Sequence, residues 1–248
     1  FVVLSKTLGK LGENMKKIVF TAFAFLIGCV HLFAGDVATF VDCGFSADGK
    51  YYVFGQYGKT DKKFQGWADI YQVDIEKNDY VSKGVFKIKP SAVTSDKSGL
   101  EVYESLEAKN FYYLKDLNCE KPNADQVLYI LEDIKKTGTD EIVFTDFRSS
   151  EIENQDTYHI NLVPTVKGSG KNVKSSFYIL LEKKDSEGNI ILNKKIGSPD
   201  IVRKGVYNYK IERIFCDKSG QNLIFVIEKM IEDDTGVSIR YMIEATKF

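Results

Sequence analysis

The side chains with the greatest potential to bind a ligand are aromatic residues in a glycine-rich stretch between Tyr51 and Tyr71. Tyr57, Phe64 and Trp67, the only tryptophan, lie in or beside the expected loop of this stretch. Aromatic rings on such a loop can stack on sugars or hold a peptide. They can equally pack the core of a sheet, because aromatic strands are usually buried. The glycines that bound the loop are Gly55, Gly58 and Gly66.

Residue patterns for metal or nucleophilic chemistry are missing from the sequence. His159 lies in a strand-like Tyr-His-Ile run, which is more typical of a structural histidine than of a catalytic base. No Cys-x-x-Cys or His-Glu-x-x-His spacing occurs, and Gly168–Lys171 lacks the rest of a phosphate-binding loop. The sequence therefore predicts no metal site and no cofactor.

Four carboxylates gather in one segment of the chain, namely Asp48, Asp61, Asp69 and Asp74. A glycoside hydrolase needs only two suitably placed carboxyl groups. Asp48 is expected to cap the backbone of a turn, and Asp69 and Asp74 are expected at the solvent-facing ends of a strand. A carbohydrate-active hydrolase that uses Asp or Glu is therefore the alternative to a non-enzymatic binding protein.

The charge of the chain argues against nucleic acid as a partner. Lys and Arg number 34 against 35 Asp and Glu, for a net charge of -1, and the basic residues are scattered. Without a basic stripe the protein cannot neutralise a run of phosphates. With 44% hydrophobic and 28% charged residues, the composition is that of a soluble globular protein.

The N-terminal region has the pattern of a secretory signal peptide over residues 15–34. Two lysines follow Met15, an apolar stretch runs from Ile18 to Ala34, and Gly35 and Asp36 begin polar sequence. Residues 1–14 precede this leader and are interpreted as an upstream reading-frame extension. Cleavage after Ala34 would release one mature domain, 35–248, into the periplasm or the medium, with no membrane span left.

A second processing route starts from Leu26-Ile27-Gly28-Cys29, which has the form of a lipobox and would make the protein a structural lipoprotein anchored at Cys29. The apolar residues 30–34 that follow favour cleavage after Ala34 instead. Three cysteines then remain, and either one disulfide with a free thiol or three unpaired thiols is compatible with their spacing. They are Cys43, Cys119 and Cys216.

The element pattern predicts an α+β fold in which strands dominate. A β-hairpin unit is expected over 36–90, a helical insert over 98–138 and a second β unit over 141–248. The insert contains two predicted helices, Ser98–Leu117 and Asn123–Lys136, the second with Asn123 and Gln126 as its start signal. A β-sandwich with a helical insert is the alternative architecture.

The two ends of the mature chain share a sequence repeat. Cys216–Phe225 aligns without gaps on Phe45–Phe54, and the turn glycines Gly49 and Gly220 fall in register. The alignment predicts two copies of one antiparallel hairpin unit, like the blades of a β-propeller. Propeller closure needs at least four blades, and any two apolar hairpins can align by chance.

Part of the chain resembles known families. Gly44–Tyr51, followed by Phe54, is similar to the F-S-x-D-G-K turn of TolB-type and WD40-like propeller blades. The longer stretch 36–90, with Gln56-Tyr57-Gly58 and Ala68–Asp74, resembles the opening of a family of predicted secreted bacterial proteins, domain of unknown function family 2259. The resemblance implies a secreted or periplasmic location and supplies no catalytic residues.

These observations together predict an exported, non-enzymatic binding or interaction protein. Its sheet edges or the loop from Tyr57 to Trp67 are expected to engage an envelope protein, a peptide or a glycan.

Overall fold

A computed structural model describes residues 36–132, 141–146, 155–233 and 236–248 of the chain. The chain divides into two units, Phe1–Ala34 and Gly35–Phe248, and all described residues belong to the second. The expectations for the upstream extension, the leader and lipidation at Cys29 lie outside the described residues.

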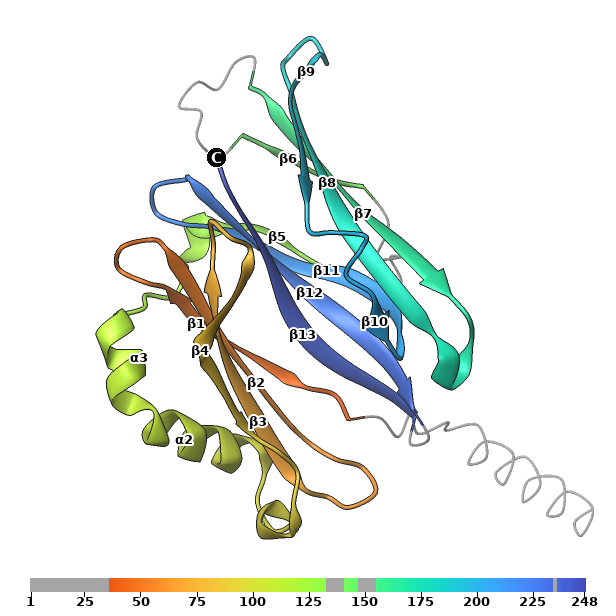
Figure 1. The fold of residues 1–248 in the computed structure, drawn as a ribbon. Helices are drawn as coiled ribbons and strands as arrows, with labels where there is room; N and C mark the ends of the chain where they lie inside the picture. Colours follow the sequence, from red (N-terminus) through yellow and green to blue (C-terminus); the bar gives the residue numbers. More distant parts are fainter. Residues whose placement is uncertain (1–35, 133–140, 147–154, 234–235) are drawn as a thin grey trace, which may run out of the picture. The chain divides into compact units, whose positions relative to one another are not determined.

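The described chain forms three antiparallel sheets (Figure 1), here called the first, central and outer sheets. The first sheet has the order β1 (Thr39–Phe45), β2 (Tyr51–Lys59), β3 (Gly66–Asp74) and β4 (Asp79–Ile88). The central sheet has the order β13 (Gly236–Lys247), β12 (Asn222–Asp233), β11 (Val206–Cys216) and β5 (Val127–Ile130). The outer sheet contains β6 (Ile142–Thr145), β7 (Thr157–Lys167) and β8 (Lys174–Lys184), and both β9 (Ile190–Ile196) and β10 (Arg203–Lys204) pair with β8. The predicted strand-dominant α+β class is confirmed.

The helical insert begins where the sequence placed it. Ser98 Oγ accepts a hydrogen bond from Glu101 N at 3.2 Å, and Glu101 Oε2 accepts one from Ser98 N at 2.6 Å. This reciprocal capping box starts α2 (Gly99–Lys109), and α3 (Phe111–Leu117) follows after a break at Asn110. Short 3-10 turns occupy Ala92–Thr94, Ala124–Gln126 and Gly170–Asn172.

The second predicted helix, Asn123–Lys136, is wrong over its described residues, 123–132, and its last residues, 133–136, lie outside the described part of the chain. Its start signal forms as expected, with Asn123 and Gln126 capping each other, but the helix ends after one 3-10 turn. The chain then becomes β5, in which Val127 pairs with Phe215 and Tyr129 with Ile214. The free edge of β11 offers this apolar segment both hydrogen bonds and burial, so tertiary pairing overrides the helical spacing.

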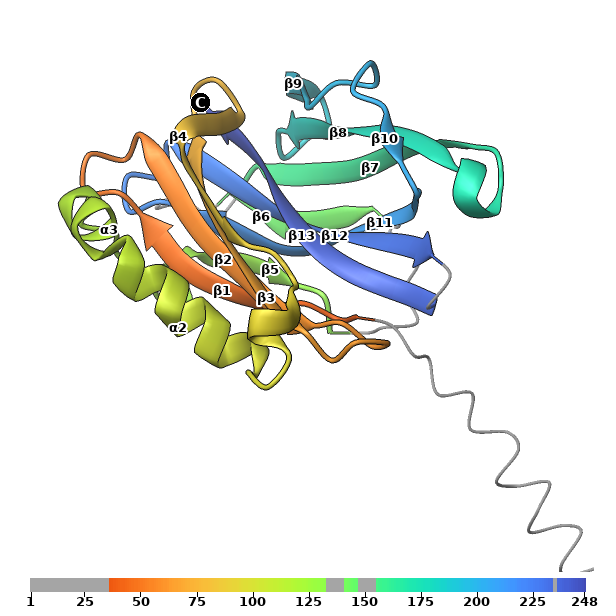
Figure 2. The ribbon, with the colours of Figure 1, turned by 60° about the horizontal axis from the view of Figure 1, so that its bottom comes forward.

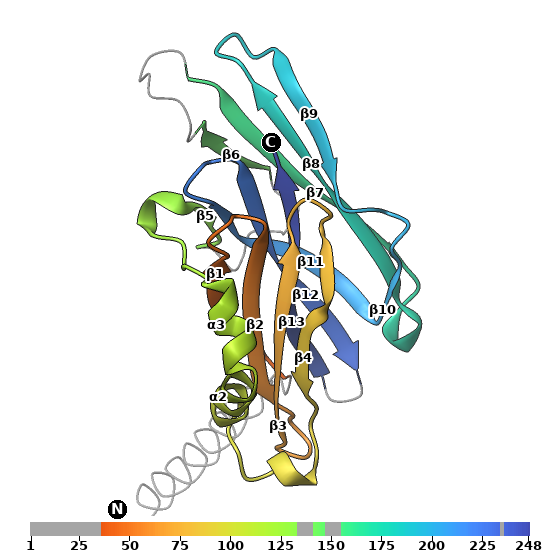
Figure 3. The same ribbon diagram turned by 60° about the vertical axis from the view of Figure 1, so that its left-hand side comes forward.

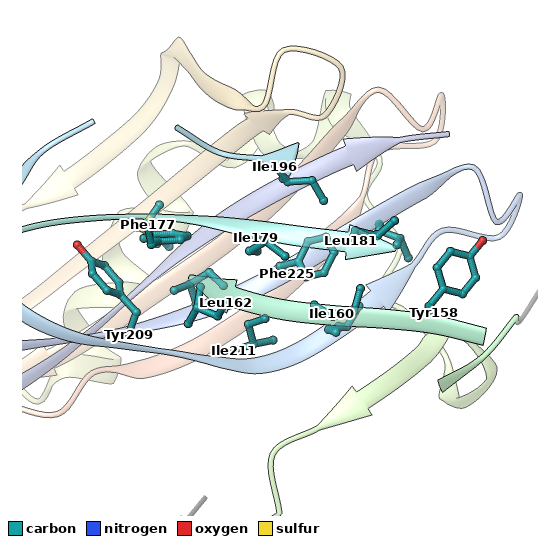
Figure 4. Close-up of a cluster of buried hydrophobic side chains, with 14 of the residues drawn as sticks. Tyr158, Ile160, Leu162, Phe177, Ile179, Leu181, Ile196, Tyr209, Ile211 and Phe225 are labelled. Atoms are coloured by element: carbon teal, nitrogen blue, oxygen red, sulfur yellow. The ribbon is translucent and has the colours of Figure 1, made fainter. Parts of the chain in front are cut away.

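The layers are held together by three apolar cores. One lies between the central and outer sheets, where Phe177, Ile179 and Leu181 of β8 and Tyr209, Ile211 and Phe225 of the central sheet gather (Figure 4). A second joins the first and central sheets and contains Tyr52, Phe54, Trp67, Ile224 and Ile243. The third packs Val102, Tyr103 and Leu106 of α2 on Val53 and Ile70 of the first sheet. The packed layers therefore follow one another in the order helices, first sheet, central sheet and outer sheet (Figures 2 and 3).

The predicted repeat is present as two matching hairpins. Ser46 N donates to Tyr51 O at 2.9 Å in the first turn, and Asp217 N donates to Asn222 O at 3.2 Å in the second. Gly49 and Gly220 both adopt left-handed conformations, with φ of 67° and 65°. The sheets remain open, so the propeller-like part of the prediction is not confirmed.

All three cysteines of the described chain are unpaired thiols. Cys43 and Cys119 pack beside the core under α2, whereas Cys216 belongs to the core between the central and outer sheets. Burial raises the pKa of each thiol to about 11, which lowers the thiolate fraction at neutral pH.

Candidate functional site: a groove along the edge of the central sheet

A groove runs along β13, the edge strand of the central sheet. Its cavity has a volume of about 930 Å³. The turn from β3 to β4 at residues 76–80 forms one wall, residues 194–203 form the other, and residues 242–248 line the floor. In Figure 1, β13 lies between β4 and β10, the strands nearest to these two walls.

The backbone of the edge strand is already occupied by polar groups. Tyr241 N donates to Gln56 Oε1 at 2.8 Å, and Ala245 N donates to Asn78 Oδ1 at 2.6 Å. Asn78 reaches this position from a left-handed conformation with φ of 51° in the β3–β4 turn. Because these N–H groups have partners, a ligand in the groove cannot simply add a strand to β13 and must meet side chains.

Glu244 connects the two walls of the groove. The residue is only 5% exposed, and its carboxylate accepts a hydrogen bond from Asn78 Nδ2 at 2.5 Å and lies 3.7 Å from the Arg203 guanidinium. Burial raises its pKa, although Asn78 and Arg203 act in the opposite direction. Gly197 permits this packing, since a Cβ there would lie 3.1 Å from Glu244 Oε2 and φ is 78°.

Lys229 contributes a poorly compensated positive charge to the groove. It lies on β12 opposite Arg240 of β13. Burial, followed by repulsion from Arg203, Lys87 and Arg240, lowers its pKa to about 8, and the charge of Asp69 opposes this only weakly. Within the described part of the chain, the Lys229 ammonium has no hydrogen-bonded partner and no ion pair. Such a group is suited to meeting an external anion.

The charged residues that line the groove have a clear excess of one sign. Six are basic and three are acidic, although the chain as a whole is slightly acidic. The basic residues are Lys77, Lys194, Lys195, Arg203, Lys229 and Lys247, and the acidic ones are Glu76, Asp79 and Glu244. A positive, partly buried groove concentrates anions.

The aromatic residues predicted to bind a ligand do not form one surface. Trp67 is 4% exposed in β3, its Nε1 donates to Asp36 Oδ2 at 2.7 Å, and the Arg240 guanidinium lies 4.0 Å from its ring. Tyr57 is half-buried, with its ring 5.7 Å from that of Tyr103. Phe64 alone is well exposed, at 64%. Binding by this loop stays a prediction, whereas Trp67 packs in the core.

The four predicted carboxylates have different surroundings. Asp48 caps its turn as expected, and hydrogen bonds from Ser46 and Lys50 lower its pKa. The pKa of Asp74 is also lowered, because hydrogen bonds from Lys77 outweigh the opposing effect of burial. Neither suits the proton donor of a glycosidase, which needs a raised pKa.

The two remaining carboxylates, Asp69 and Asp61, lie in β3 and in the loop that precedes it. The expectation that Asp69 ends a strand is wrong, since it lies within β3 and accepts a hydrogen bond from the Tyr71 hydroxyl at 3.0 Å. Asp61 lies in the loop between β2 and β3.

His159 has a partner for each ring nitrogen. Its Nδ1 lies 3.0 Å from Glu141 Oε1 and its Nε2 lies 3.1 Å from Thr157 Oγ1. The order carboxylate, imidazole, hydroxyl is that of a nucleophilic triad. His159 lies on β7 of the outer sheet and does not line the groove. We therefore interpret its two hydrogen bonds as structural.

The sequence offered little signal for the groove. Asn78, Arg203, Lys229 and Glu244 belong to four separate segments and match no motif. The one usable clue is the placement of Lys229 and Glu244 inside strands that are otherwise mainly apolar, since buried charges are rare without a partner or a role.

Comparison with protein-family models matches residues 53–247 to the family described as Predicted secreted protein (DUF2259). The match extends far beyond 36–90, the stretch that carries the clearest sequence resemblance, and includes the groove residues Asn78, Arg203, Lys229 and Glu244. Comparisons with curated proteins and with solved structures give no match. Among the described residues, no helix has the length and apolar character to cross a membrane. The chain belongs to this family of predicted secreted proteins, in agreement with the resemblance inferred from its sequence.

Proposed function

We propose that the protein is an exported binding protein that holds an anionic ligand in the groove along β13. The observation that carries the proposal is Lys229, whose partly buried ammonium has no ion pair among the described residues, in a groove where basic residues outnumber acidic ones. A buried, unpaired charge destabilises the folded state. Its retention is explained if a bound ligand supplies the opposite charge.

The groove favours a short acidic peptide as this ligand. Its volume of about 930 Å³ is near the upper end of the range for small-ligand sites, roughly 300–1,000 Å³. Apolar side chains, including Ile196, Met242 and Phe248, lie among the basic ones. Glycan sites commonly use several exposed aromatic platforms, whereas the aromatic residues that line this groove are Tyr80 and Phe248, and Trp67 is buried outside it.

Titration of the purified mature protein with fluorescent hexapeptides tests the proposal. Alternating Asp-Leu and Lys-Leu peptides and an acidic oligosaccharide are compared by anisotropy at two salt concentrations. We expect the acidic peptide to bind, and Lys229→Met to weaken binding by about tenfold or more, since a desolvated charge pair contributes at least 1.4 kcal/mol.

The matched control is Lys109→Met, which removes an exposed lysine on α2 and should leave the affinity unchanged. Binding that is equal in both variants would contradict the assignment of the groove. Preference for the acidic oligosaccharide would contradict the peptide and retain the anion site. The hydrolase alternative and the aromatic loop stay predictions that this titration does not depend on.

A further inference from the structure

The turn between β2 and β3 exposes an aromatic ring from an unusual backbone conformation. Phe64 has a φ of 50°, in the left-handed region, and is 64% exposed. Bulky side chains rarely adopt this conformation, in which glycine and asparagine are the common residues. Thr60 N donates to Gln65 O at 3.0 Å, and Gln65 N donates to Thr60 Oγ1 at 3.0 Å, which fixes the base of the turn. The fold therefore holds a large apolar side chain in solvent at the end of a hairpin.

Two further exposed apolar side chains lie at the same end of the molecule. Val93, in the 3-10 turn before α2, is 81% exposed, and Leu100, in the first turn of α2, is 46% exposed. This segment packs on the hairpin, since a Cβ at Gly66 would lie 3.0 Å from Lys97 O. The β2–β3 turn and the start of α2 both lie at the lower end of Figure 1. Phe64, Val93 and Leu100 are here called the apolar tip.

Basic side chains surround the apolar tip. In residues 59–66 and 89–101, the exposed charged side chains are those of Lys59, Lys62, Lys63, Lys89, Asp96, Lys97 and Glu101. Glu101 is engaged by hydrogen bonds from Ser98, which lower its pKa together with smaller effects of Lys97 and Lys59. Asp61, in the same turn as Phe64, is half-buried. This end of the molecule is therefore positively charged, although the whole chain has a net charge of -1.

We propose that this end of the protein docks on an anionic lipid surface, with the apolar tip among the headgroups and the lysines against their negative charges. Small ligands bind in concave sites, whereas the tip projects from a hairpin turn and does not line the groove along β13. Apolar side chains enter the boundary between headgroups and acyl chains, and lysines bury their methylene stems there while the ammonium groups stay hydrated. The excess of lysines over acidic residues complements negatively charged lipids.

Flotation of the purified mature protein with phospholipid vesicles tests the proposal. Vesicles of phosphatidylcholine alone are compared with vesicles that also contain phosphatidylglycerol, at low and high salt. We expect binding to the anionic vesicles only, with a decrease at high salt because exposed charges are screened. Phe64→Asn should weaken the binding by about tenfold, since it removes an apolar ring from the interface. Lys63→Gln should weaken it by about fivefold, the usual contribution of one lysine near an anionic surface.

The matched controls are Tyr112→Asn, which removes an 80% exposed aromatic ring of α3, and Lys109→Gln, which removes an exposed lysine of α2. Both should bind vesicles as the wild type does. Phe64→Asn should keep the wild-type Tm, because asparagine adopts the left-handed conformation more readily than phenylalanine. The proposal is wrong if the protein binds neither kind of vesicle, as expected of a surface that docks on a soluble protein. Equal binding to both kinds of vesicle, or equal losses in Phe64→Asn and Tyr112→Asn, would also overturn it.

Discussion

The β1–β3 and β11–β13 units share their first turn and the strand pairing next to it, and they have different neighbours. Tyr52 and Phe54 of the first unit face the central sheet, and the aligned Leu223 and Phe225 face the outer sheet. On the opposite side, Val53 meets α2, whereas the aligned Ile224 meets the first sheet. Equivalent faces of the two units therefore pack against different layers of the molecule. The local chemistry of the hairpin does not determine which layer covers each face.

The size of one aligned side chain accounts for much of this difference. Gly55 of β2 corresponds to Val226 of β12, and a Cβ at Gly55 would lie 2.3 Å from the Tyr103 ring of α2. The glycine leaves space for an aromatic side chain from a helix, whereas Val226 fills the flat contact between two sheets. A second aligned pair, Gly58 and Lys229, distinguishes the two units in charge.

Removal of a core aromatic side chain that occupies the same aligned position in both units should cause the largest loss of stability. Phe54→Ala and Phe225→Ala remove rings that are completely buried at aligned positions, so each should lower the free energy of unfolding by about 3–5 kcal/mol. Urea denaturation of both variants measures it. A loss below 1 kcal/mol in one of them would show that its core is less tightly packed than the structure indicates.

Making the first unit resemble the second should break the contact with α2. Gly55→Val would drive a side chain into the Tyr103 ring, and overpacking of this kind costs about 1–3 kcal/mol. Helical circular dichroism should decrease at the same time. Lys59→Val, at the exposed end of β2, is the control and should change stability by less than about 0.5 kcal/mol. An unchanged Gly55→Val protein would contradict the close approach of α2.

Removing the charge that distinguishes β12 should stabilise the protein at neutral pH. Lys229 has a folded pKa of about 8, below its ordinary value of 10.5, so the unfolded chain binds more protons between these limits. Wild-type stability should therefore rise with pH from about 8 to 10.5, whereas Lys229→Met should lack this contribution. We expect Lys229→Met to raise the Tm most at pH 7, with the difference shrinking toward pH 10. A difference that grows with pH would contradict the lowered pKa.

Substitution of the two turn glycines should give the smallest changes in the free energy of unfolding, and the two changes should be nearly equal. Gly49→Ala and Gly220→Ala each force a non-glycine residue into a left-handed conformation, at a cost of about 1–2 kcal/mol. Thermal unfolding of the pair should show losses within about 0.5 kcal/mol of each other. A clearly unequal pair would show that one turn is supported by its surroundings, for instance by the Asn222 side chain that donates to Gly49 O at 3.0 Å.

The sequence by itself determined the features that depend on neighbouring residues. The turns at Gly49 and Gly220, the start of α2 at Ser98 and the strand-dominant class all follow from short-range hydrogen bonds, left-handed turn positions and local apolar patterns. The family resemblance was also readable, because the residues that carry it are contiguous.

Only the tertiary structure decided the features that depend on distant partners. Val127–Ile130 carries helical spacing and becomes a strand because β11 offers it an edge. Trp67 is buried because Asp36 and Arg240 surround its indole, although its residue type suits a binding loop equally well. The groove unites Asn78, Arg203, Lys229 and Glu244 from separate strands and turns. The pKa of a charged side chain depends on its burial and on neighbouring charges. Both arise from contacts between distant segments, which no local sequence pattern contains.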